Sequence, residues 1–317
     1  MISHRTIDVD GLEFHLAEAG PADGPVVLLL HGFPECWYSW RHQLTALGER
    51  GFHAVAPDQR GYGRSAAPAD PATYTVPHLV GDAIGVLDAV GAQRALVVGH
   101  DWGAPVAWHT ALLRPDRVRG ILALSVPHRA RGATRPTVAL EKRFGKGFYQ
   151  LYFQEPGVAD AELGADPRAT FRRLLTATGG GSTVRLDVPP GGGFLSTLPE
   201  PDGLPAWLTE ADLDTYVEEY ARNGFTGGLN WYRCLDRTWE LTGAWRGARI
   251  GVPAAFLAGT DDVVVAGMPF DALVAGLRTA VPDLRTAVSL PGCGHWTQQE
   301  RPAEVTEAIV EMASSAP

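Results

Sequence analysis

Cysteine is scarce in this sequence of 317 residues, and its few occurrences lie far apart. Cys36, Cys234 and Cys293 are odd in number, and none of them belongs to a C-x-x-C pair. This spacing argues against a disulfide framework and against a zinc site made from cysteine pairs. We therefore expect free or buried thiols, a reducing compartment and no bound metal.

A long hydrophobic run is also missing. The apolar stretch "VVLLL" at 26–30 is far too short to span a bilayer. The first residues, "MISHRTIDVDG", contain no apolar core of the length that a signal peptide needs. The sequence thus predicts a cytoplasmic protein with no membrane partner.

Positively charged residues are also few compared with negatively charged ones. The formal net charge is -9, and no block of Lys or Arg forms a track for phosphates, which argues against a nucleic-acid partner. With 45% hydrophobic residues, the composition is that of an ordinary globular protein. The length allows one large core with an inserted subdomain, or two small domains.

Short β-branched runs alternate with helical stretches in the first third of the chain, which predicts βαβ units. The expected strands include "PVVLLLHG", "FHAVAPDQRG", "RALVVGHD", "RVRGILALSVP" and "VPAAFLAGTDD", and "TVPHLVGDAIGVLDAVG" reads as an amphipathic helix closed by Gly91. Between 129 and 243 the strand pattern gives way to aromatic-rich helical patterns and a Gly/Pro-rich loop. We predict a mostly parallel sheet with helices on both faces, from residues 1–128 and 244–317, and a helical cap from residues 129–243. The cap should lie over the carboxyl edge of the sheet, where α/β sheets bind ligands.

The stretch "LVVGHDWGAPVAW" places Asp101 between a strand and a helix, flanked by Gly99 and Gly103. Small residues two positions before and after a central residue are typical of the sharp turn that presents the nucleophile in α/β-hydrolases. A side chain at either glycine would collide with the crossing strand or helix. The pattern predicts that Asp101 is the nucleophile, at a position where a serine is more usual. Its neighbour His100 points along the turn and is expected to have a structural role.

An acid and a histidine should follow the nucleophile in the chain, because α/β-hydrolases carry that order. His295 lies in the Gly-rich loop "LPGCGHWTQQERP" after a late strand, where it can reach Asp101. The segment "AFLAGTDDVVV" offers Asp261 and Asp262. We favour Asp262 as the acid, from the spacing Gly259 to Asp262, and keep Asp261 as the alternative.

Two backbone N–H groups should bind a developing oxyanion in such a site. One belongs to Trp102, directly after Asp101. The motif "HGFP" at 31–34 follows an early strand and supplies the other through Phe33.

Six segments together resemble the α/β-hydrolase-fold epoxide hydrolases, above all the hydrolase domain of the soluble (cytosolic) enzymes. They are "HGFPECWYSWRHQ", "APDQRGYGRS", "GHDWGAPVAW", "FYQLYFQEPGVADAE", "LNWYR" and "GCGHWTQ". The resemblance implies a small-molecule epoxide as substrate, no cofactor, and two cap tyrosines that bind the epoxide oxygen. The motifs place these at Tyr149 and Tyr232, which with Phe33 and Trp102 would contact the substrate. Tyr152 is the alternative to Tyr149, three residues further along the same helix.

An aspartate suits this chemistry because its carboxylate is ionised at neutral pH and forms an ester that water can cleave. A serine would form an ether with an epoxide carbon. The alternative function is a haloalkane or haloacid dehalogenase, which uses the same ester chemistry. A haloalkane dehalogenase would carry Asn or Glu at the position of Phe33. A haloacid dehalogenase would carry arginines directly after the nucleophile to bind the substrate carboxylate, but here "WGAP" follows Asp101. A non-catalytic protein of this fold should have lost a catalytic residue, and none is missing here.

Overall fold

The structure is a computed structural model that describes residues 1–181, 184 and 186–315. Within this part of the chain, eight strands form one sheet in the order β1-β2-β4-β3-β5-β6-β7-β8. The strands are β1 (Ser3–Val9), β2 (Leu12–Ala19), β3 (Val26–Leu30), β4 (His53–Pro57), β5 (Ala95–His100), β6 (Val118–Leu124), β7 (Ala254–Gly259) and β8 (Leu284–Leu290). From β4 to β8 all neighbours are parallel, which confirms the predicted mostly parallel sheet. The antiparallel pairs β1–β2 and β2–β4 were not predicted.

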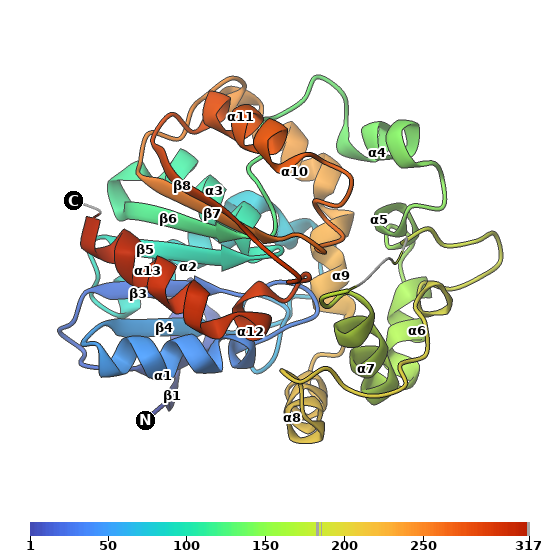
Figure 1. Cartoon of the computed structure of the whole chain (residues 1–317), viewed down its shortest axis with the longest axis horizontal. Helices are drawn as coiled ribbons and strands as arrows, with labels where there is room; N and C mark the ends of the chain where they lie inside the picture. Colours follow the sequence, from blue (N-terminus) through green and yellow to red (C-terminus); the bar gives the residue numbers. More distant parts are fainter. Residues whose placement is uncertain (182–183, 185, 316–317) are drawn as a thin grey trace.

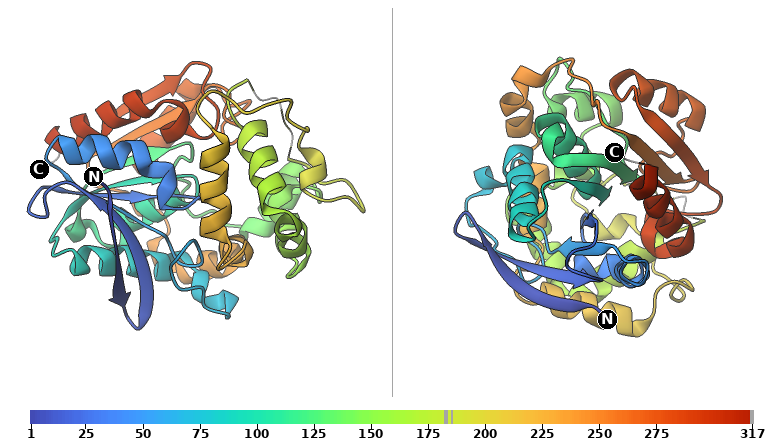
Figure 2. Two further views of the ribbon diagram at one scale, coloured as in Figure 1. Left: turned by 90° about the horizontal axis from the view of Figure 1, so that it is seen from below. Right: turned by 90° about the vertical axis from the view of Figure 1, so that its left-hand side faces the viewer.

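The central strands are apolar along their length because helices cover both faces of the sheet. All six residues of β5 are buried, as are four of the five in β3. The helices of this core are α1 (Arg41–Glu49), α2 (Val76–Ala89), α3 (Gly103–Leu113), α11 (Phe270–Ala280), α12 (Thr297–Glu300) and α13 (Pro302–Ser315). Helices α1 and α13 pack together on one face, and α2 and α3 on the other (Figure 2).

Helix α2 shows how the sequence sets a core element. Its buried residues include Leu79, Val80, Ala83 and Leu87, which recur at the three- and four-residue spacing of one helix face. The helix stops before Gly91, whose φ of +74° lies in the left-handed region that terminates helices, as predicted.

A group of helices enters between β6 and β7 and forms the cap. They are α4 (Pro136–Phe144), α5 (Tyr149–Tyr152), α6 (Val158–Ala165), α7 (Pro167–Ala177), α8 (Glu210–Tyr220), α9 (Thr226–Arg233) and α10 (Leu235–Leu241). Figure 1 shows the cap to one side of the sheet, with both chain termini on the side away from it. The exact cap boundaries, 129 and 243, stay a prediction. Part of the Gly/Pro-rich cap loop, residues 182, 183 and 185, lies outside the described residues.

The carboxyl ends of the parallel strands bring the predicted site residues to one edge. Asp101 follows β5, Asp262 lies just beyond β7, and His295 lies in the loop after β8. The three cysteines are buried and free. Among the described residues, no helix combines the length and the apolar character needed to cross a bilayer.

Candidate active site

Asp101 sits at the tip of a tight turn between β5 and α3. Its φ of +48° is left-handed, a conformation that costs energy for a residue with a side chain. The flanking glycines permit the turn: a Cβ on Gly99 would collide with the backbone of Gly103, and a Cβ on Gly103 with the carbonyl of Leu30. The predicted need for two glycines here is confirmed by these contacts.

One oxygen of the Asp101 carboxylate points at the loop after β3. The backbone N–H of Phe33 donates to Asp101 Oδ1 over 2.7 Å. Gly32 makes this approach possible, because a Cβ there would overlap the Asp101 side chain. Trp102 precedes α3, at the end of a helix where backbone N–H groups lack partners within the helix. The Phe33 N–H thus reaches the carboxylate, and the Trp102 N–H stays a predicted donor.

The other oxygen faces His295. His295 Nε2 lies 3.4 Å from Asp101 Oδ2, and His295 Nδ1 lies 2.9 Å from Asp262 Oδ1. The fully buried Asp262 also accepts from the Val264 N–H over 2.9 Å. Asp261 is directed elsewhere: its Oδ2 accepts from the Gly181 N–H over 2.8 Å. The structure thus brings Asp262, the favoured acid, to His295, and gives Asp261 a contact with the cap.

The charges of this group support one another. Burial opposes the imidazolium form, but the carboxylates of Asp262 and Asp101 hold the pKa of His295 well above its usual value. Burial likewise opposes the Asp101 anion, yet the hydrogen bond and charge of His295 and the Phe33 N–H lower the pKa of Asp101. Asp101 is therefore ionised at neutral pH, as attack on an electrophilic carbon requires.

The cap places two of its tyrosines together near this carboxylate. The ring centroids of Tyr149 and Tyr232 are 6.1 Å apart, and Tyr232 packs edge-on against Trp102 and Phe33 at 5.1 and 5.5 Å. Gln150 Nε2 donates to the Tyr149 hydroxyl over 3.0 Å, which leaves the phenolic proton for another acceptor. Burial, and then the charge of Asp101, raises the pKa of Tyr232 well above its usual value, and burial is also the main cause that raises the pKa of Tyr149.

Tyr152 has a different partner. Its hydroxyl donates to Glu162 Oε2 over 2.8 Å. Burial and the Glu162 carboxylate raise the pKa of Tyr152 to about 12. Of the two tyrosines in α5, Tyr149 is the one whose ring lies against Tyr232.

A buried polar cluster that contacts the His295 backbone was not predicted from the sequence. His100 Nδ1 lies 2.8 Å from Glu35 Oε2, and His100 Nε2 donates to the His295 carbonyl over 2.7 Å. Gln298 and Gln299 each donate to Glu35 Oε1 over 2.9 Å. The structural role predicted for His100 agrees with these bonds. Glu35 and Gln298 are 263 positions apart, and only their place in the motifs "HGFPE" and "HWTQQE" could have indicated this pairing.

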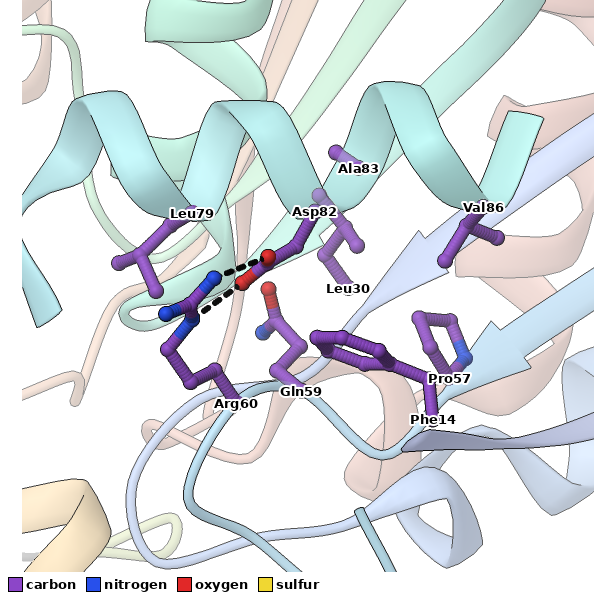
Figure 3. Close-up of a pocket in the computed structure, with 9 residues that line it drawn as sticks. All are labelled: Phe14, Leu30, Pro57, Gln59, Arg60, Leu79, Asp82, Ala83 and Val86. Carbon is purple, nitrogen blue, oxygen red and sulfur yellow. Dashed lines mark hydrogen bonds and ion pairs between the residues drawn. The ribbon is translucent and has the colours of Figure 1, made fainter. Parts of the chain in front are cut away.

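Hydrogen bonds of the His31 side chain hold the loop that carries Phe33. Gln59 N–H donates to His31 Nε2 over 3.0 Å, so the ring proton is on Nδ1, which faces the Gly32 carbonyl over 3.0 Å. Figure 3 shows Gln59 beside the ion pair of Arg60 and Asp82. These residues line a cavity of 10 Å³, at the lower limit for one water molecule.

Within the described residues, no three His, Cys, Asp or Glu side chains gather to hold a metal ion.

Comparison with known proteins gives a consistent result. A family model described as alpha/beta hydrolase fold matches residues 25–302. Epoxide hydrolase A of Mycobacterium tuberculosis is 48% identical over 98% of this chain and 97% of its own length. The crystal structure of Epoxide Hydrolase A from Mycobacterium thermoresistibile superposes with a TM-score of 0.94 at 47% identity, covering 100% of this chain and 99% of the other. Bifunctional epoxide hydrolase 2 of Sus scrofa is 36% identical over 95% of this chain, which spans 53% of that protein.

These matches extend over nearly the whole chain, at identities well above those that show only a shared fold. They agree with the eight-stranded sheet of the described residues and with an aspartate in the nucleophile turn. The chain therefore belongs to the epoxide hydrolases of the α/β-hydrolase fold.

Proposed function

We propose that this enzyme converts an epoxide and water to a vicinal diol in two steps, through an ester on Asp101. In the first step Asp101 Oδ2 attacks an epoxide carbon, because Oδ1 is held by the Phe33 N–H. The C–O bond of the ring breaks and its electron pair remains on the epoxide oxygen. No base is needed, since the pKa of Asp101 is lowered by His295 and Phe33 despite its burial.

Tyr149 and Tyr232 would donate hydrogen bonds to that leaving oxygen as its charge develops. An unassisted alkoxide is a poor leaving group, so donors aimed at it lower the barrier. Burial raises the pKa of both phenols, which keeps their protons in place at neutral pH. The substrate would lie between these hydroxyls and the carboxylate, in contact with Phe33 and Trp102.

In the second step His295 takes a proton from water, which attacks Asp101 Cγ. The N–H groups of Phe33 and Trp102 stabilise the oxyanion that forms on Oδ1. As the oxyanion collapses, the bond between Asp101 Cγ and Oδ2 breaks, and Oδ2 leaves as a hydroxyl of the diol with the proton that His295 holds. The proton that the water oxygen still carries leaves the new Asp101 carboxyl group and neutralises the other diol oxygen, which restores the carboxylate. Asp262 orients the imidazole through Nδ1. Esterification removes the negative charge of Asp101, one of the groups that raise the pKa of His295, so the imidazole becomes a free base more readily once the ester has formed.

The position of the Asp101 carboxylate carries this proposal. One oxygen is bound by a backbone N–H and the other faces a histidine backed by a buried acid. A dehalogenase would share these features, but a departing halide needs no proton from a tyrosine pair. Diol release from a styrene-type epoxide, measured beside halide release from a haloalkane, separates the two activities.

Isotope labelling tests the ester. A single turnover with excess enzyme in ¹⁸O-water should give mostly unlabelled diol, because Asp101 donates the new oxygen and water replaces it on the enzyme. Mass spectrometry of the peptide containing "GHDWG" should then find the label. Fully labelled diol in that turnover would mean that water attacks the epoxide directly.

The compartment is part of the proposal. Three scattered, buried and free cysteines suit a reducing environment, and we propose the cytoplasm.

A further inference from the structure

Glu300, the last residue of α12, is a buried acid that the reaction scheme does not use. Its side chain collects three backbone N–H groups: Gly294 and Gly180 donate to Oε2 over 2.9 and 3.0 Å, and Trp296 donates to Oε1 over 3.1 Å. The residue is only 9% exposed. A buried carboxylate with three such partners is held firmly in one position, because charge-assisted hydrogen bonds are stronger than neutral ones.

The three donors come from two parts of the molecule. Gly294 and Trp296 flank His295, whereas Gly180 belongs to the cap segment that follows α7. The same cap segment binds His295 directly, since the His295 N–H donates to the Thr178 carbonyl over 2.9 Å.

The two backbones approach each other too closely for any side chain. A Cβ on Gly294 would collide with the backbone of Gly179, and a Cβ on Gly180 with the carbonyl of Gly292. The cap is thus joined to the histidine loop by backbone packing and by one shared carboxylate.

We propose that Glu300 is a positioning residue that ties the cap segment 178–180 to the loop of His295 and holds the imidazole ready for the water step. The inference rests on the proposed role of His295 as the base of ester hydrolysis. Attack by Asp101 does not need that base. Loss of the Glu300 carboxylate should therefore slow the second step and spare the first.

The test compares Glu300→Gln with Glu304→Gln. Glutamine keeps the size of the side chain but has one oxygen to accept bonds instead of two. Glu304 is the matched control, because its carboxylate is exposed and lies 4.0 Å from Arg301 Nε. Excess enzyme is mixed with a styrene-type epoxide and quenched at intervals, and intact-protein mass spectrometry gives the formation and decay of the ester.

In Glu300→Gln we expect ester formation within about twofold of wild type and ester hydrolysis slowed about tenfold, roughly the effect of one hydrogen bond to a charged group. Glu304→Gln should match wild type in both steps. Glu300→Asp keeps the charge on a shorter side chain and should recover part of the hydrolysis rate.

Two results would overturn the inference: both steps slowed equally, or neither slowed. If Glu300→Gln does not fold, Glu300→Asp is judged by the same two rates. Failure of the proposed function looks different, because the wild type itself would then form no ester in any quenched sample.

Discussion

The core and the cap hold the side chains of the proposed site in different ways. Asp101 accepts a hydrogen bond from the Phe33 N–H, and His295 is held by hydrogen bonds to Asp262 and to the Thr178 carbonyl. The cap tyrosines are placed mainly by ring packing, as in the edge-on contacts of Tyr232 with Phe33 and Trp102. Hydrogen bonds fix distance and direction, whereas apolar packing fixes volume. Substitutions in the cap should therefore change which substrate shapes fit the site, while the ester chemistry of the core stays the same.

The largest expected effect comes from the core residue His295. Its replacement in His295→Gln should lower turnover by about a thousandfold or more, because ester hydrolysis loses its base. Formation of the ester should continue, since Asp101 is already ionised. Intact-protein mass spectrometry should show the enzyme plus one substrate mass. An unmodified mutant, with a substrate that wild type converts, would show that His295 acts before the ester forms.

The cap tyrosines should give the opposite pattern. Tyr149→Phe with Tyr232→Phe should abolish ester formation, because both donors to the leaving oxygen are lost. Each single change should lower the rate by roughly tenfold or more and leave some activity. The control is Tyr152→Phe, whose hydroxyl binds Glu162 and should matter little. If Tyr152→Phe is damaging and Tyr149→Phe silent, the assignment within α5 is wrong.

Acid pH should separate the same two regions. His295 must be neutral to accept a proton, so ester hydrolysis should fall about tenfold per pH unit below its pKa in the ester. That pKa should lie below the value in the free enzyme, where Asp101 as well as Asp262 raises it. The rate of ester formation should not fall at these same pH values, because Asp101 attacks without help from a base. NMR titration of His295 in the free enzyme, beside single-turnover rates, checks the difference.

Alkaline pH tests the cap alone. Burial raises the pKa of Tyr149 and Tyr232, so both should stay protonated above pH 10, where an ordinary tyrosine is half ionised. Ester formation should therefore remain constant through about pH 10. A decline centred there would mean that the donors are exposed to water.

The same contrast between core and cap explains which site residues could be predicted from the sequence. Asp101, His295 and Asp262 lie at strand ends, where the spacing of glycines and the chain order of the fold limit the choice. Tyr149 and Tyr232 came only from the family resemblance, because an aromatic-rich helix carries no local sign of which ring faces the site.

The residues that were missed share a physical cause. Glu35 meets its partners Gln298 and Gln299 from the far end of the chain. The sequence offers Asp261 only as the alternative acid, yet its carboxylate accepts a hydrogen bond from the cap backbone at Gly181. Neither contact leaves a local pattern, since each depends on how distant segments pack. The β1–β2 pair escaped prediction because β1 is largely exposed and its sequence, "SHRTIDV", is mostly polar.

The smallest expected effects come from one substitution made in each region. In Gly103→Ala the new methyl group would press on the Leu30 carbonyl inside the core, and the free energy of unfolding should fall by about 1–3 kcal/mol. Gly164 lies in cap helix α6 with open space around its Cα, so Gly164→Ala should raise that free energy by about 0.5–1 kcal/mol through better helix propensity. Chemical denaturation of both variants measures the two changes. Diol release should fall in Gly103→Ala, because the turn that holds Asp101 must shift, and should be retained in Gly164→Ala. Equal destabilisation by both changes would mean that the cap is packed as tightly as the core, and the contrast between the two regions would not hold.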